Sequence, residues 1–79
     1  MEQKNEKTTS EIGAKFSQFL KEKRIAKGLS IRKFSILIYG SESQNSYLND
    51  IENGKREPNL KTLSLILDRL NCSIDFIEH

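Results

Sequence analysis

Apolar residues recur along most of the chain at the three- and four-residue spacing of helices. The first such run follows Thr8, which lies three residues before Glu11 as in a capping box, and it stops before Gly28, a residue suited to a left-handed helix end. Its predicted inward stripe consists of Ile12, Phe16, Phe19 and Leu20. This run predicts a long first helix.

Two shorter helices are predicted next, joined by the turn-forming stretch "YGSES". Ser30 caps the first of them, which should end near Gly40, and Ser41 or Ser43 can cap the following one. The predicted inward stripe of the helix after Ser30 consists of Ile31, Phe34, Ser35 and Ile38.

The helix after "YGSES" is expected to run to about Asn53 and to end at Gly54. An advance of about 100° per residue separates its side chains into two faces. One face holds Gln44, Tyr47, Leu48 and Ile51, and the other holds Asn45, Ser46, Asn49 and Asn53. The first face is expected to join the core, and the second is an uncharged row of hydrogen-bonding groups.

A further helix is predicted after Pro58, with Asn59 as its N-cap. Its predicted inward stripe is Leu60, Leu63, Ile66, Leu67 and Leu70. Ser73 begins a short terminal helical turn in "IDFIE". The fold class expected is all-α, a compact five-helix bundle, with residues 1–9 as a mobile arm and residues 10–79 as the domain.

Length and composition indicate one globular domain, because 79 residues cannot supply two cores and 35% are hydrophobic against 30% charged. No apolar run could span a bilayer, and the first residues lack the apolar section of a signal peptide, so a cytoplasmic location is expected. Cys72 and His79 are too few for a zinc site. We expect no metal, cofactor, membrane or small-molecule ligand.

The net charge of +2 is unevenly distributed. Residues 1–30 carry seven Lys and Arg against four Glu, residues 31–58 carry four basic against four acidic residues, and the remainder carries two against three. This asymmetry is compatible with one surface that meets phosphate and another that meets protein. Asp50 and Glu52 diverge by about 200° on a helix and cannot act as an acid/base pair, so no enzyme activity is expected.

The polar face at residues 45–53 is what major-groove reading requires, because an α-helix enters that groove and amide side chains match the edge of adenine. The adjoining loop "NGKR" places Lys55 and Arg56 where they could meet phosphate. The competing interpretations are a solvated helix face and a plain surface turn.

The stretches "KEKRIAKGLSIRKFS" and "SYLNDIENGKREPNLKTLSLILDRLNCSIDFI" closely resemble the Cro and phage-repressor (Xre-type) helix-turn-helix family, over roughly residues 12–77. The resemblance implies a five-helix DNA-binding domain, usually dimeric on a palindromic operator, whose third helix is the recognition helix. It assigns an internal ion pair to Arg24 and Glu52. It assigns base reading to Asn45, Ser46, Asn49 and Asp50, and phosphate contact to Ser30, Gln44, Asn53, Lys55 and Arg56.

The chain departs from the family pattern at two places. Ile31 stands where the family commonly has a glutamine that contacts the DNA backbone, so this contact is lost or moves to Arg32 or Lys33. The stretch "IYGSE" is about three residues longer than the family turn, so either the preceding helix gains a turn or the loop bulges. Asp50 also has two open roles, as an acceptor for a cytosine N4 donor or as the partner of a basic neighbour.

The leading hypothesis is a transcriptional regulator, specifically a repressor that binds double-stranded DNA as a homodimer. Residues outside the inward stripes are candidates for the dimer surface: Ile36, Leu65, Ile74, Phe76 and Ile77. One alternative is an antitoxin that binds a toxin protein and represses its own operon. Another is an interaction module that has lost DNA binding.

Overall fold

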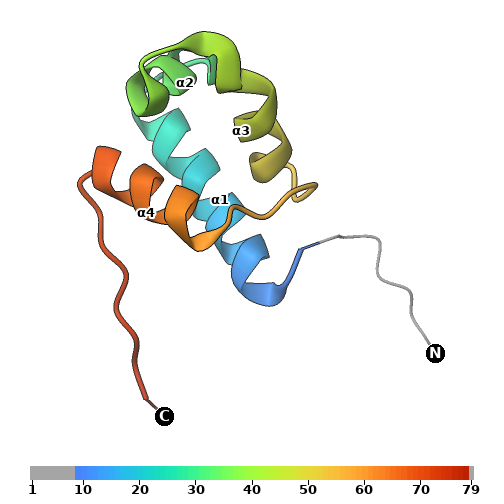
Figure 1. Cartoon of the computed structure of the whole chain (residues 1–79), viewed down its shortest axis with the longest axis vertical. Coiled ribbons are helices and arrows are strands. Elements are labelled where there is room, and N and C mark those ends of the chain that lie inside the picture. The colour runs from blue at the N-terminus through green and yellow to red at the C-terminus, as the bar shows by residue number, and fades with distance from the viewer. Residues whose placement is uncertain (1–8, 79) are drawn as a thin grey trace, which may run out of the picture.

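The computed structural model describes residues 9–78, and these contain four α-helices, one 3-10 turn and no β-strand (Figure 1). The helices are α1 (Glu11–Ala26), α2 (Ile31–Tyr39), α3 (Asn45–Glu52) and α4 (Leu60–Arg69), and the 3-10 turn η1 (Glu42–Gln44) immediately precedes α3. None of the helices in this described part has the length and apolar character that a bilayer crossing requires.

Side-chain caps fix where the helices begin. Ser30 and Asn59 cap α2 and α4 as predicted, each accepting a hydrogen bond from the backbone N–H three residues further on. Helix α1 is capped by Ser10, whose hydroxyl accepts from the Gly13 N–H at 3.0 Å. Ser10 therefore takes the capping role that was predicted for Thr8, which lies outside the described residues.

Helices α1 and α2 end at the predicted glycines. Gly28 and Gly40 have φ values of 69° and 77°, in the left-handed region where a Cβ atom would be strained. At the end of α1, the Gly28 N–H donates to the Ile25 carbonyl and the Leu29 N–H donates to the Arg24 carbonyl. These bonds satisfy two carbonyl groups that have no partner within the helix, and they direct the chain toward the start of α2.

One apolar core lies where the four helices meet, and its fully or almost fully buried members come from each of them or from their ends: Leu20, Phe34, Ile38, Leu48, Ile51, Ile66 and Leu70. Burial of each such side chain is worth about 1.5–3 kcal/mol. Three residues predicted to face inward do not. Ile12 and Leu60 lie in the first turns of α1 and α4 and are 73% and 82% exposed, and Gln44 is exposed because it belongs to η1.

Of the two outcomes expected for the stretch "IYGSE", the longer helix is the one formed: α2 continues through Ile36, Leu37 and Ile38 to Tyr39, and η1 follows before α3. The Ser41 hydroxyl accepts from the Ser43 N–H, while the buried Ser35 hydroxyl donates to the Ser41 carbonyl at 2.6 Å. The longer connection is therefore ordered by serine hydroxyls, and it does not bulge.

The prediction of a fifth helix is wrong, since residues 71–78 form none. Asn71, with φ 56°, ends α4 in a left-handed conformation, and the Cys72 N–H donates to the Leu67 carbonyl at 2.9 Å. Beyond this point the chain runs away from the helices (Figure 1). A five-residue helix must recover its nucleation cost by packing, and Phe76 is 92% exposed.

Candidate nucleic-acid interface

Helix α3 separates a buried inner face from a polar outer face. Leu48, Ile51 and Glu52 are buried on the inner side. Ser46, Asn49 and Asn53 are exposed, and Asn45 is half-buried beside them. At about 100° per residue the outer side chains fall within an arc of roughly 140° that includes Asp50. The predicted row of amide and hydroxyl groups thus occupies one continuous face.

Asp50 has a basic partner in the same chain. The Arg56 Nε lies 3.2 Å from Asp50 Oδ2, and the Arg56 guanidinium carbon lies 5.6 Å from the centre of the Tyr47 ring. The first distance is at the long end of the range for an N–H···O hydrogen bond, and the second is within the range of a cation–π interaction. Of the two roles open for Asp50, pairing with a basic neighbour is the one formed in the structure, and it holds Arg56 against the side of α3.

The "NGKR" turn follows α3 directly. Gly54 has φ 74°, its N–H donates to the Ile51 carbonyl, and the Lys55 N–H donates to the Asp50 carbonyl at 2.8 Å. These bonds close the end of α3 in the manner of a Schellman motif. Lys55 and Arg56 consequently emerge, exposed, next to the carboxyl-terminal end of the outer face.

The start of α2 meets the start of α3 around a second group of predicted contacts. A hollow of about 390 Å³ is lined by Ser30, Ile31, Arg32, Lys33 and Asn45. Arg32 Nε lies 3.2 Å from Glu42 Oε1, which η1 supplies. Three predicted phosphate contacts and one predicted base contact therefore border the same hollow.

Ile31 and Gln44 occupy less expected environments. Ile31 is half-buried and packs against the core, so it has a structural role at the position where the family commonly has an amide. Gln44 is exposed directly before α3, and its side chain does not cap that helix.

The ion pair between Arg24 and Glu52 is formed. Arg24 Nε donates to Glu52 Oε2 at 2.8 Å, and the side chains are 19% and 3% exposed. Arg24 Nη1 also donates to the Leu29 carbonyl at 2.9 Å. A buried charge pair mainly fixes geometry, and this one links the last turn of α1 to the end of α3 and to the entry into α2.

A second link was not predicted. The Glu57 carboxylate, which follows "NGKR", accepts a hydrogen bond from the Ser10 N–H at the start of α1. Hydrogen bonds from the Ser10 side chain and backbone lower the pKa of this carboxyl below its ordinary value. A Cβ atom on Gly13 would collide with the Glu57 side chain, so the glycine permits the approach. A glycine in a first helical turn was the only sequence signal.

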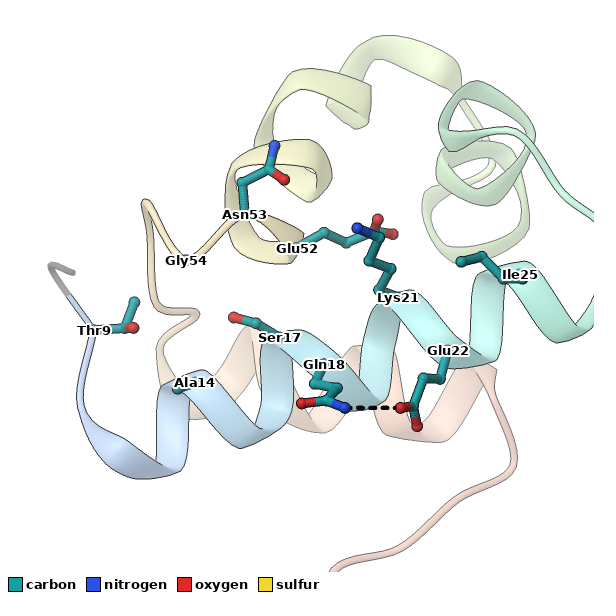
Figure 2. A pocket seen from close by; sticks show the side chains of 10 residues that line it. All are labelled: Thr9, Ala14, Ser17, Gln18, Lys21, Glu22, Ile25, Glu52, Asn53 and Gly54. Carbon is teal, nitrogen blue, oxygen red and sulfur yellow. Dashed lines mark hydrogen bonds between the residues drawn. The ribbon is translucent and has the colours of Figure 1, made fainter. Parts of the chain in front are cut away.

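A hollow of about 410 Å³ separates α1 from the end of α3 (Figure 2). Asn53 and Glu52 line it from one side, and Gln18 and Lys21 line it from α1, with Lys21 projecting toward Glu52. No place at this surface was predicted for Lys21 from the sequence. The available signal was its position three residues before Arg24, which places both on one face of the helix.

Comparison with known protein families gives a match over most of the chain. A model of the helix-turn-helix family matches residues 20–77, which include the last seven residues of α1 and all of α2, α3 and α4. No curated protein and no solved structure matches the chain. On the strength of the family match, the chain belongs to the Xre/phage-repressor-type helix-turn-helix family and is a DNA-binding regulator.

Proposed function

We propose that this protein is a transcriptional repressor that binds a palindromic operator as a homodimer. The observation that carries the proposal is the outer face of α3, where uncharged amide and hydroxyl groups stand between two arginine-bearing ends. Such a helix suits the major groove, where amides can donate to and accept from a base edge together. Occupying a promoter in this way would exclude the transcription machinery.

The outer face and its surroundings divide into two kinds of contact. Asn45, Ser46 and Asn49 are assigned to base reading, with Asp50 at the edge of that group. Phosphate contacts are assigned to Ser30, Arg32, Lys33, Gln44, Asn53, Lys55 and Arg56. The first group would set the operator sequence, and the second would set the register on the duplex and the salt dependence.

The homodimer is proposed from an apolar surface on a different part of the molecule. Two adjoining hollows, of about 290 and 500 Å³, are both lined by Ile12, Leu63, Leu67 and Ile74. Phe76 lines the larger one, and Ile77 next to it is 74% exposed. A second copy would cover these side chains, and two recognition helices would then meet successive major grooves about 34 Å apart. Leu65, which is half-buried, and Ile36 line neither hollow, so they are the least supported dimer candidates.

In vitro selection from a random duplex library tests the proposal. The expected result is a two-fold symmetric site with half-sites about ten base pairs apart, bound by two protein chains. Binding should weaken steeply as salt rises, because basic side chains release counterions from phosphate. Asn49→Ala should cost about 1–3 kcal/mol on the selected site. A protein that binds no duplex at low salt would refute the proposal.

The same apolar surface favours the antitoxin as a second candidate, because a toxin protein could cover it in place of a second copy. The molecular mass of the isolated protein in solution distinguishes the homodimer from the antitoxin. A stable dimer whose association depends on Phe76 supports the homodimer. The antitoxin is supported if the protein is a monomer, its gene lies beside a toxin-like reading frame, and it binds the protein which that frame encodes.

A further inference from the structure

We propose that Glu42 and Asp50 limit the affinity of this protein for DNA by acting as internal competitors of phosphate for Arg32 and Arg56. This inference rests on the proposed function, because it assumes that α3 and its flanking arginines face DNA. It changes the role of Asp50 from a base-reading residue to a residue that holds an arginine. It also gives a role to Glu42, which the lengthened turn supplies.

The two arginine–carboxylate pairs stand at opposite ends of α3. Arg32, in the first turn of α2, pairs with Glu42 of η1, immediately before α3 begins. Arg56, in the turn after α3, pairs with Asp50 of α3 itself. The Nε to carboxylate oxygen distance is 3.2 Å in both pairs. Each end of the proposed reading face therefore presents an arginine that is already neutralised by its own chain.

Solvent exposure makes both pairs exchangeable. The side chains of Arg32 and Glu42 are 66% and 59% exposed, and those of Arg56 and Asp50 are 60% and 32% exposed. Exposed ion pairs are worth only about 0–1 kcal/mol, and the planar guanidinium group can donate to either a carboxylate or a phosphate. A DNA phosphate can thus replace the carboxylate. The Arg24–Glu52 pair is buried and is not available for such an exchange.

The exchange lowers affinity for any duplex. When phosphate takes the guanidinium, the released carboxylate remains beside the DNA and repels it. This cost is electrostatic and independent of sequence, so it weakens binding to the operator and to other DNA alike. An amide at either position removes the repelling charge and releases the arginine without a large change in shape.

The experiment measures the affinities of Glu42→Gln and Asp50→Asn for the selected operator and for a scrambled duplex of equal length, at several salt concentrations. We expect each variant to bind both duplexes about three- to tenfold more tightly at low salt, as expected for removal of one nearby like charge. The gain should shrink as salt rises, because screening shortens the range of the interaction. The slope of log affinity against log salt should steepen by up to about 0.9 for each released arginine.

Asp68→Asn is the matched control. It removes the same charge from a carboxylate that lies 3.9 Å from Arg69 Nη1, but on α4. Helices α3 and α4 lie on different sides of α1 in Figure 1. Affinity for both duplexes should stay within about twofold of wild type, because Asp68 lies outside the proposed DNA-contacting surface and salt screens its charge. An equal gain in the control would show an effect of net charge alone and would overturn the proposal.

A second arm tests the pairing itself, by combining Glu42→Gln with Arg32→Gln. The gain from Glu42→Gln should be smaller when Arg32 is absent, because the repulsion of phosphate is still relieved but no arginine is released. An undiminished gain would overturn the competitor role. For Asp50→Asn, a loss on the operator alone would assign Asp50 to base reading instead. Wild-type binding without any gain in the variants refutes only this inference, whereas no binding by any of the proteins refutes the proposed function as well.

Discussion

The α2–α3 unit (residues 31–52) and the segment after α4 (residues 71–78) differ in how far their apolar side chains are buried. In the first, Phe34, Ile38 and Leu48 are fully buried, and the buried Glu52 has a charged partner. In the second, Ile74, Phe76 and Ile77 are 50%, 92% and 74% exposed. Both regions are rich in apolar side chains. Among residues 9–78, only the first region finds a surface that buries them.

This difference explains why one region forms a helix at each predicted position and the other does not. Short helices in proteins owe most of their stability to packing of an apolar face, since the nucleus is costly. Helix α3 has only eight residues, but Leu48 and Ile51 are buried and Arg24 holds its last turn. No comparable contact covers residues 74–77 within the described chain.

The largest expected effect comes from the centre of the α2–α3 unit. Phe34→Ala removes a fully buried ring from the core. Such substitutions cost about 3–5 kcal/mol because they lose transfer energy and leave a cavity. In a 79-residue domain that loss is a large part of the total stability. Denaturant unfolding measures it, with Phe34→Leu as a milder control, and a cost below about 1 kcal/mol would contradict the assigned burial.

A somewhat smaller effect is expected at the Arg24–Glu52 ion pair, which connects α3 to α1. Glu52→Ala leaves Arg24 partly buried without its carboxylate and should cost about 3 kcal/mol, at the lower end for a buried pair because Arg24 is 19% exposed. The double variant Arg24→Ala, Glu52→Ala should cost less than the sum of the two single variants. Additive costs from denaturant unfolding would show that the two charges do not stabilise each other.

Local sequence signals located most of the helix boundaries. The caps Ser30 and Asn59 and the terminal glycines Gly28, Gly40 and Gly54 each act within a few residues, so spacing alone revealed them. The polar face of α3 could be predicted because its period follows from helix geometry. The Arg24–Glu52 pair came from the family resemblance, since residues 28 apart give no local signal of contact.

The remaining features depend on contacts between distant parts of the chain. Glu57 reaches Ser10 across 47 residues, and the pairing of Arg32 with Glu42 depends on how η1 continues from α2. Ile12 and Leu60 satisfy the helical period but lie beyond the reach of the core. Periodicity gives the direction of a side chain, and it does not give the extent of the surface on the opposite side.

Glu57 provides a pH-dependent effect smaller than that of the buried pair, because its carboxylate is exposed. Its pKa is lowered in the folded state by hydrogen bonds from Ser10. The stability it contributes is therefore fully present above the unfolded-state pKa, about 4.3, and is lost as pH falls through the lower folded-state value. Glu57→Gln should destabilise the protein at neutral pH, and the difference from wild type should shrink in acid.

Unfolding measured from neutral pH to below pH 4 tests this effect, with Glu22→Gln as a control. Glu22 is also exposed, and its carboxylate accepts a hydrogen bond from Gln18 within α1. Gly13→Ala should resemble Glu57→Gln in its pH dependence, because the added methyl displaces the Glu57 carboxylate. A difference between wild type and Glu57→Gln that is constant with pH would exclude the proposed link to Ser10.

The smallest effect on folding is expected in the segment after α4. Phe76→Ala truncates the same residue type as Phe34→Ala, but from a ring that is 92% exposed. At concentrations where the protein is monomeric, the free energy of unfolding should change by less than about 0.5 kcal/mol. If a second copy covers the apolar surface, the dissociation constant of the dimer should rise about tenfold, as is common for an aromatic interface residue.

Ile36→Ala is the control, because Ile36 is an exposed aliphatic residue on α2 that lines neither apolar hollow. Sedimentation equilibrium and dilute-solution unfolding together test the comparison: a large folding defect in Phe76→Ala would show that the segment packs within its own chain, and unchanged association would remove Phe76 from the interface.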